Sequence, residues 1–97
     1  MSIARIGEVH AKPDRAEELR LFLISIMPMI RSSEGCESVQ LYQSDEDPGK
    51  FIMIEVWDST EFHRASVENI PAEKLGEIGP LLATSPSGGY FRLVDHK

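Results

Sequence analysis

The sequence has a single cysteine, Cys36, among its 97 residues, so no disulfide can form within one chain. We read Cys36 as a small buried apolar residue, and a chain of this kind suits the reducing cytoplasm, where we expect it to act. Its most apolar window, residues 21–30, falls short of the roughly 20 residues that a membrane helix needs. The N-terminus has no basic segment followed by a long apolar core, which predicts no signal peptide.

Basic residues are scarce: ten Lys and Arg stand against sixteen Asp and Glu, a formal net charge of −6. Nucleic acids and anionic membranes are recognised through clustered cations, so we expect neither as a partner. The histidines His10, His63 and His96 lack the spacing of metal ligands. Gly88-Gly89 does not open a helix, as a phosphate-binding loop would. We therefore expect no metal and no cofactor.

The remaining sequence predicts one α+β domain over residues 1–97, because apolar periodicity switches between two and about 3.6 along the chain. The predicted order β-α-β-β-α(α)-β is typical of the ferredoxin-like fold, a four-stranded antiparallel sheet with helices on one face. We expect strands over residues 3–11, 36–43, 51–57 and 90–94, and helices over residues 15–32, 59–69 and, in short pieces, 71–82.

Local signals refine these elements. Pro28 predicts a kink or a restart within the first helix, because proline removes a helix hydrogen bond. Gly35 suits the left-handed position that ends a helix. Asp58 or Ser59 is expected to cap the second helix, and Asp58 and Glu61 have capping-box spacing.

The stretch 51–57 is apolar on both faces, with Ile52, Ile54 and Val56 on one side. A strand of this kind must be covered on both faces, and the chain's own helices can cover only one. The other face, to which we also assign Val39 and Leu41, would be a large exposed apolar patch. We therefore expect a homodimer in which two sheets pair face to face as a dimeric α/β barrel.

The opposite side of the same strand carries the candidate site. Glu55, between Met53 and Trp57, is a poorly solvated carboxylate that can accept a proton or pair with an arginine such as Arg5. Trp57 can stack on a planar ligand or pack in the core. Five further residues are candidates: Phe51, Met53 and Phe22 as pocket walls, Tyr42 as a pocket phenol or dimer-rim residue, and His63, expected to face solvent, as a second proton acceptor.

Several short motifs with their spacing resemble the antibiotic biosynthesis monooxygenase family: Lys12-Pro13, Gly35-Cys36, Leu41-Tyr42, Asp47-Pro48 and Glu55-x-Trp57. This resemblance covers nearly the whole chain. It implies a ferredoxin-like subunit in a dimeric α/β barrel. It also implies oxidation of a planar quinol-like or polycyclic aromatic molecule by dioxygen, without metal or flavin.

The chain departs from relatives at two positions. Many members have histidine where this chain has Ser66, and the quinol-oxidising members have asparagine where it has Met53. The first strand has no asparagine of the kind used by haem-degrading relatives, which disfavours haem degradation. Catalysis is thus an inference from the family.

Two alternatives remain open on the same fold. One is a non-catalytic small-molecule-binding or stress-response dimer, which the absence of histidine at position 66 favours. The other is an isomerase of a small phosphorylated metabolite. That reaction needs several cations converging on the pocket, and the available arginines are Arg5, Arg31, Arg64 and Arg92.

Overall fold

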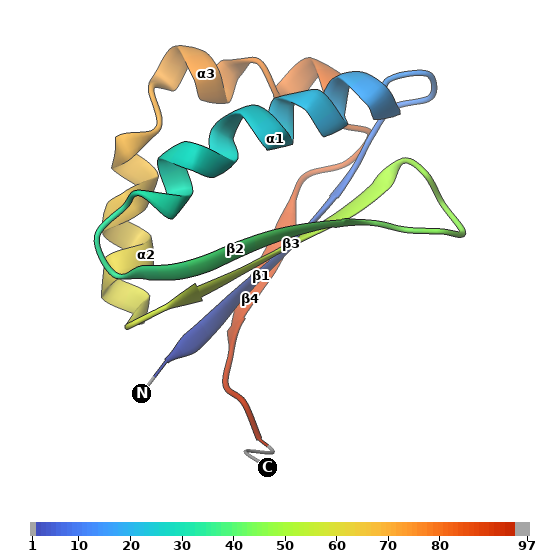
Figure 1. Ribbon diagram of the computed structural model, residues 1–97. Helices are drawn as coiled ribbons and strands as arrows, with labels where there is room; N and C mark the ends of the chain where they lie inside the picture. The colour runs from blue at the N-terminus through green and yellow to red at the C-terminus, as the bar shows by residue number, and fades with distance from the viewer. Residues whose placement is uncertain (1, 95–97) are drawn as a thin grey trace.

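The computed structural model describes residues 2–94, and Figure 1 shows its single sheet with the helices on one side. The elements are β1 (Ile3–His10), α1 (Ala16–Arg31), β2 (Cys36–Gln43), β3 (Lys50–Trp57), α2 (Thr60–Ser66), the 3-10 turn η1 (Val67–Asn69), α3 (Ala72–Gly76), the 3-10 turn η2 (Gly79–Leu81) and β4 (Ser87–Phe91). This order confirms the predicted ferredoxin-like arrangement. His96 lies outside the described residues. Within residues 2–94, no helix has the length and apolarity needed to cross a bilayer.

The sheet has the strand order β2-β3-β1-β4, and each neighbouring pair is antiparallel. The two central strands, β1 and β3, pair along their whole length, with Arg5 opposite Glu55. On its other side, β1 pairs with β4 so that Arg5 lies opposite Tyr90. Residues directly opposite each other in a sheet point to the same face. Arg5, Glu55 and Tyr90 are therefore neighbours on one face.

That face is covered by the helices, and the core lies between them (Figure 1). Helix α1 contributes an apolar stripe at three- and four-residue spacing: Leu19, Phe22, Leu23, Ile26 and Ile30. The sheet contributes Val39, Phe51 and Trp57. Trp57 and Leu19 have no exposed surface, so the end of β3 is fixed firmly against the helices.

Pro28 does not restart the first helix, because α1 is one continuous helix from Ala16 to Arg31. The missing N–H costs one backbone hydrogen bond. Ile26 and Ile30, on either side of the proline, are both buried in the core. Their burial offsets that loss and holds the last turn of the helix in place.

The chain leaves α1 and enters β2 through Gly35, which adopts the predicted left-handed conformation with φ of +84°. A Cβ at this position would overlap the ring of Phe62, so the backbone and the α2 side chain are in close contact. Helix α2 begins after Ser59, whose Oγ accepts a hydrogen bond from the backbone N–H of Phe62 at 3.3 Å. The cap is therefore Ser59, and Asp58 with Glu61 does not form the predicted capping box.

Two other predictions are wrong. The last strand begins at Ser87, not Tyr90, because Gly88 and Gly89 pair with β1 instead of forming a loop. Val39 and Leu41 belong to the helix-covered face, since they lie opposite Glu55 and Met53. Val39 is accordingly buried in the core.

Candidate functional site

A cavity of about 410 Å³ lies between the helix-covered face of the sheet and the helices. Its base comes from β1 and β3, where Gly7, Phe51 and Met53 contribute to the lining. Ile26 and Ile30 of α1 form one wall, and Val67, Ile70 and Leu75 line another part. Pockets that bind small molecules typically measure about 300–1,000 Å³ and are mostly apolar. This cavity meets both criteria.

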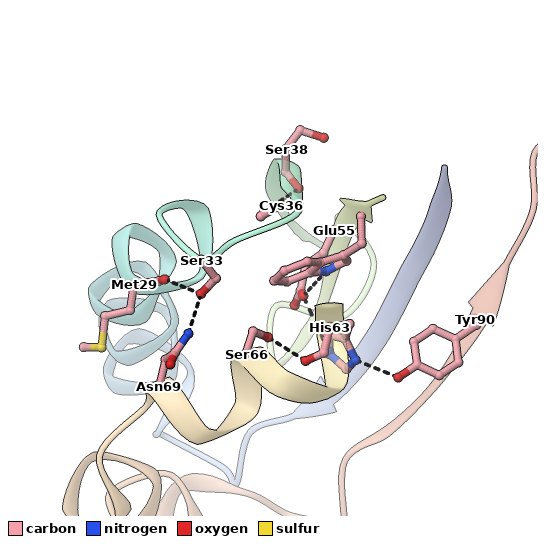
Figure 2. A network of polar contacts seen from close by, with 10 residues as sticks. Met29, Ser33, Cys36, Ser38, Glu55, His63, Ser66, Asn69 and Tyr90 are labelled. Atoms are coloured by element: carbon pink, nitrogen blue, oxygen red, sulfur yellow. Dashed lines mark hydrogen bonds and ion pairs between the residues drawn. The ribbon is translucent and has the colours of Figure 1, made fainter. Parts of the chain in front are cut away.

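Polar side chains from three elements meet at the cavity: Glu55 from β3, His63 from α2 and Arg5 from β1. Figure 2 shows Glu55, His63 and Tyr90 following one another across the space between β3, α2 and β4. The carboxylate and the imidazole are both largely shielded, with 12% and 14% of their side-chain surface exposed. The cavity therefore combines an apolar body with one concentrated polar region.

Trp57 holds the carboxylate of Glu55 in place. The indole Nε1–H donates a hydrogen bond to Oε1 of Glu55 at 2.9 Å. The two residues are separated by one position on β3, so they point to the same face. No side-chain nitrogen or oxygen of the described residues is both buried and without a partner. The second oxygen of Glu55, for which residues 2–94 supply no donor, is thus open to the cavity.

His63 faces the cavity instead of solvent, contrary to the prediction from sequence. Its Nδ1 lies 2.7 Å from the hydroxyl of Tyr90, and its Nε2 lies 3.9 Å from Oε1 of Glu55. The ring also contacts the Trp57 and Tyr90 rings edge-on, at centroid distances of 5.6 and 5.4 Å. These contacts fix the plane of the imidazole. With the proton on Nδ1 donated to Tyr90, Nε2 is a free acceptor beside Glu55.

Arg5 supplies the positive charge at the cavity. Its Cζ lies 5.0 Å from the centre of the Tyr90 ring, in a cation–π contact. Arg64 lies over the same ring, 5.6 Å from its centre. Tyr90 thus connects the imidazole of His63 with two guanidinium groups.

Burial raises the pKa of Glu55 above its ordinary value of 4.5. The hydrogen bond from Trp57 and the charge of Arg5 both act in the opposite direction, because each stabilises the carboxylate. A carboxylate that is destabilised by burial is a stronger base than one in water. Glu55 is therefore suited to take a proton from a weakly acidic group in the cavity.

The pKa of His63 is lowered below 6.5, first by burial and then by the charges of Arg5 and Arg64. Both causes disfavour the imidazolium. The neutral ring can still accept or donate through either nitrogen, depending on where its proton lies. His63 can consequently relay a proton between the cavity and Tyr90.

Four predicted site residues line the cavity: Phe51, Met53, Glu55 and His63. Three do not. Trp57 is fully buried in the core and cannot stack on a ligand in the cavity, although its N–H orients Glu55. Phe22 is buried on α1 away from the cavity lining, where it packs in the core.

Tyr42 is the third. It lies opposite Ile52, on the sheet face that the helices leave uncovered, and it is 51% exposed. Its phenol therefore does not enter the cavity of its own chain, which leaves the predicted position at a dimer rim.

Ser66, where relatives have histidine, does not take that histidine's place at the cavity. Its Oγ donates to the carbonyl oxygen of His63, one turn earlier in α2, at 2.6 Å (Figure 2). The side chain is buried against its own helix. In this chain the imidazole of the site comes from position 63.

Two residues of the site were not predicted as such. Arg5 enters the sequence-based prediction only as an ion-pair partner for Glu55 or as one of four scattered cations, and Tyr90 only as the start of a strand. Both reach the site through the pairing of β1 with β3 and β4. The available signal was the Gly88-Gly89 pair, since glycine within a strand marks a close approach by another group.

These features define a class of protein: a small ferredoxin-like α+β protein with an apolar cavity between its sheet and its helices. A shielded acid, an imidazole and a cation line that cavity. The sequence profile described as "Antibiotic biosynthesis monooxygenase" matches residues 2–71. The chain belongs to this family.

Solved structures give the same fold over nearly the whole chain. A protein of Chloroflexus aurantiacus, proposed to be an antibiotic biosynthesis monooxygenase, is 27% identical with a TM-score of 0.76, covering 100% of this chain and 98% of that one. PA3566 of Pseudomonas aeruginosa is 24% identical with a TM-score of 0.81, covering 96% and 95%. Rv0793 of Mycobacterium tuberculosis is 23% identical with a TM-score of 0.78, covering 99% and 98%. Among curated proteins, none matches the chain.

Proposed function

We propose that this protein is a cofactor-independent monooxygenase that oxidises a planar quinol-like or polycyclic aromatic molecule with dioxygen. The observation that carries the proposal is the position of Glu55. Its carboxylate is shielded from water, held through one oxygen by Trp57 and open to an apolar cavity through the other. Membership of the monooxygenase family supports the same reaction class.

The proposed reaction begins with proton transfer from the substrate to Glu55. The resulting carbanion or phenolate is electron-rich and passes one electron to dioxygen. The two radicals then combine, forming a carbon–oxygen bond and a peroxide. With anthrone as the example, the hydroperoxide loses water to leave a carbonyl, so CH₂ and O₂ become C=O and H₂O. One oxygen atom enters the product, and the substrate itself supplies all the electrons.

The protein's own contribution is to bind, orient and deprotonate. The apolar walls exclude water, which strengthens the proton acceptor and protects the reactive anion from reprotonation. Ile26, Ile30 and Met53 supply surfaces for a flat ring system. His63 transfers protons between the cavity and Tyr90, whose hydroxyl lies 2.7 Å from Nδ1 of His63. Holding the substrate in one orientation beside Glu55 lowers the entropic cost of the reaction.

The test is oxygen uptake with a panel of anthrones and dihydroxynaphthalenes, each corrected for spontaneous oxidation. We expect Glu55→Gln to lower kcat/KM by about 10²–10⁴-fold, the usual contribution of a general base. Glu61→Gln, a change of the same kind at an exposed position of α2, serves as the control and should keep full activity. Binding without any oxygen consumption across the panel would instead favour the non-catalytic binding protein.

A further inference from the structure

The guanidinium of Arg5 is held beside two residues of β4, Gly88 and Tyr90. It lies over the ring of Tyr90, with Cζ 5.0 Å from the ring centre, and it lies close against the backbone of β4. A Cβ at Gly88 would be 2.9 Å from Nη2 of Arg5 and 3.1 Å from its Cζ. The absence of a side chain at Gly88 thus makes room for the guanidinium. Arg5 is fixed in place by an aromatic face and a bare stretch of strand.

Fixed in this way, Arg5 makes no hydrogen bond or ion pair with any of residues 2–94, although Glu55 lies opposite it on β3. The Glu55 carboxylate is directed instead to the indole of Trp57. Because no side-chain nitrogen of the described residues is both buried and unpartnered, the free N–H groups of Arg5 retain accessible surface. Arg5 also lines the cavity. The site therefore offers the rigidly held N–H donors of the Arg5 guanidinium, which have no acceptor among residues 2–94.

In this respect Arg5 differs from two other arginines of the chain. The protein has a net charge of −6, and the arginines Arg15 and Arg20 of α1 each pair with a glutamate one turn away. At the cavity, a cation is kept beside apolar walls. A guanidinium in such surroundings binds an anionic oxygen strongly, because little water competes for it.

We propose that Arg5 is the specificity-determining residue of this cavity and that it binds an anionic oxygen carried by a planar aromatic ligand. The inference rests on the proposed function only in taking this cavity as the ligand site. The ligand's ring system lies along Ile26, Ile30 and Met53, and its oxyanion faces Arg5. Glu55 and His63 line the same cavity, where they can take the proton that the ligand loses. A phenolate, an enolate and a carboxylate share this chemistry.

The assignment also gives Arg5 a use in the reaction. Deprotonation of a phenol or an anthrone places negative charge on oxygen, and a fixed cation nearby stabilises that charge as it develops. Arg64, above the same ring of Tyr90, reinforces the positive potential from the outer side. Glu55 opposes it while ionised and ceases to do so once it has taken the proton.

The experiment measures binding under nitrogen, so that turnover does not enter. Three probes are titrated: a nitronaphthol whose anion has its own absorption band, naphthoate, and the neutral naphthamide. The variants are Arg5→Gln, Arg5→Lys and, as a control that removes one exposed guanidinium from the end of α1, Arg31→Gln. Circular dichroism establishes that each variant is folded.

We expect Arg5→Gln to weaken binding of at least one anionic probe by about 10- to 100-fold, the usual range for a hydrogen bond to a charged group. Naphthamide should bind about equally to the wild type and the variant. Arg5→Lys should recover part of the affinity, and the bound nitronaphthol should ionise at lower pH in the wild type than in Arg5→Gln. A larger loss for nitronaphtholate assigns a phenolate-type ligand, and a larger loss for naphthoate assigns a carboxylate.

The proposal is overturned if Arg5→Gln binds both anions as tightly as the wild type does. It is equally overturned if naphthamide loses as much affinity as the anions, since Arg5 would then act through packing alone. Failure of the monooxygenase proposal looks different: Arg5-dependent binding would persist while no substrate of the panel consumed oxygen.

Discussion

Burial disfavours the ionised form of Glu55, and the hydrogen bond from Trp57 partly offsets this effect. Burial raises the pKa of Glu55, and the Trp57 N–H, 2.9 Å from Oε1, is the largest influence in the other direction. Trp57 is thus a positioning residue that acts on the chemistry through Glu55. A structural role alone would change stability but not the pH at which activity appears.

Trp57→Phe keeps an aromatic ring but removes the donor, so the pKa of Glu55 should rise further. If ionised Glu55 is the base, the acid limb of kcat/KM against pH should move to higher pH. Leu19→Val, which removes buried volume elsewhere in the core, should leave the limb in place. An unmoved limb in Trp57→Phe would contradict the role given to the indole.

Glu55 also predicts how stability depends on pH. A carboxyl whose pKa is higher in the folded than in the unfolded protein binds protons more tightly when folded, so its contribution to stability falls as pH rises through the folded pKa. Glu55→Gln, which keeps an acceptor for Trp57, should therefore be more stable than the wild type near neutral pH. The gain should shrink as pH falls toward the ordinary value of 4.5.

Urea unfolding at several pH values measures this difference. Glu17→Gln is the matched control with the opposite sign, because its hydrogen bond with Arg20 lowers the pKa of Glu17. That substitution should give no gain at neutral pH. A Glu55→Gln protein that is less stable than the wild type at every pH would show that the charge of Glu55 is well compensated in the fold.

At the scale of elements, the site depends on how α2 is attached to the sheet. The helix begins one residue after Ser59 and carries His63 on its first turn, while Phe62 packs against the bare backbone of Gly35. The turn that joins α1 to β2 therefore sets the position of the imidazole. A change at Gly35 reaches the cavity without touching it.

We expect Gly35→Ala to destabilise the protein by several kcal/mol, because φ of +84° is unfavourable for alanine and its Cβ would overlap the Phe62 ring. Gly76→Ala provides the comparison, since a Cβ there meets nothing within 4 Å. It should be neutral or slightly stabilising. Thermal unfolding of both variants measures the difference, and equal midpoints would contradict the packing described.

The elements themselves were largely predictable from the sequence. Alternation marked the strands, and spacing marked the helices, because both are local properties of the chain. Alternation says which residues share a face, but not which face the helices cover. Val39 was for this reason assigned to the wrong side. The six-residue turn between β2 and β3, residues 44–49, does not fix their register, so long-range packing decides it.

The candidate site was predictable only in part, for the same physical reason. Glu55, Met53 and Phe51 lie on one strand, and local alternation brings them together. Arg5 and Tyr90 join them through pairing between strands far apart in the sequence, which no local pattern encodes. The inward direction of His63 likewise depends on how α2 packs against the sheet, where the ring contacts Trp57 and Tyr90.

At the scale of the whole molecule, the sheet has one face that no helix of residues 2–94 covers. The strand register places a set of apolar side chains there, from β1, β2, β3 and β4: Ala4, Ile6, Tyr42, Ile52, Ile54, Val56 and Phe91. Tyr42 and Phe91 are each 51% exposed. Apolar side chains gathered on one face in this number are costly to leave in water. We propose that a second copy of the chain covers it, sheet against sheet.

Sedimentation at micromolar concentration tests the dimer. The wild type should sediment as a dimer, and Ile54→Asp should sediment as a folded monomer, because the aspartate would be buried between two sheets without a partner. Leu21→Asp, at an exposed position on α1, is the control and should remain dimeric. A monomeric wild type would contradict the proposal.

Monooxygenation in this cavity is tested most directly with labelled oxygen. Anthrone is oxidised under ¹⁸O₂, and the mass of the product is measured by mass spectrometry. A reaction without protein serves as the comparison. We predict one labelled atom in each molecule of product, formed at a rate that falls to the spontaneous level in Glu55→Gln. Product that forms no faster with the wild-type protein than without it, or product whose new oxygen atom is unlabelled and so came from water, would contradict monooxygenation by this cavity.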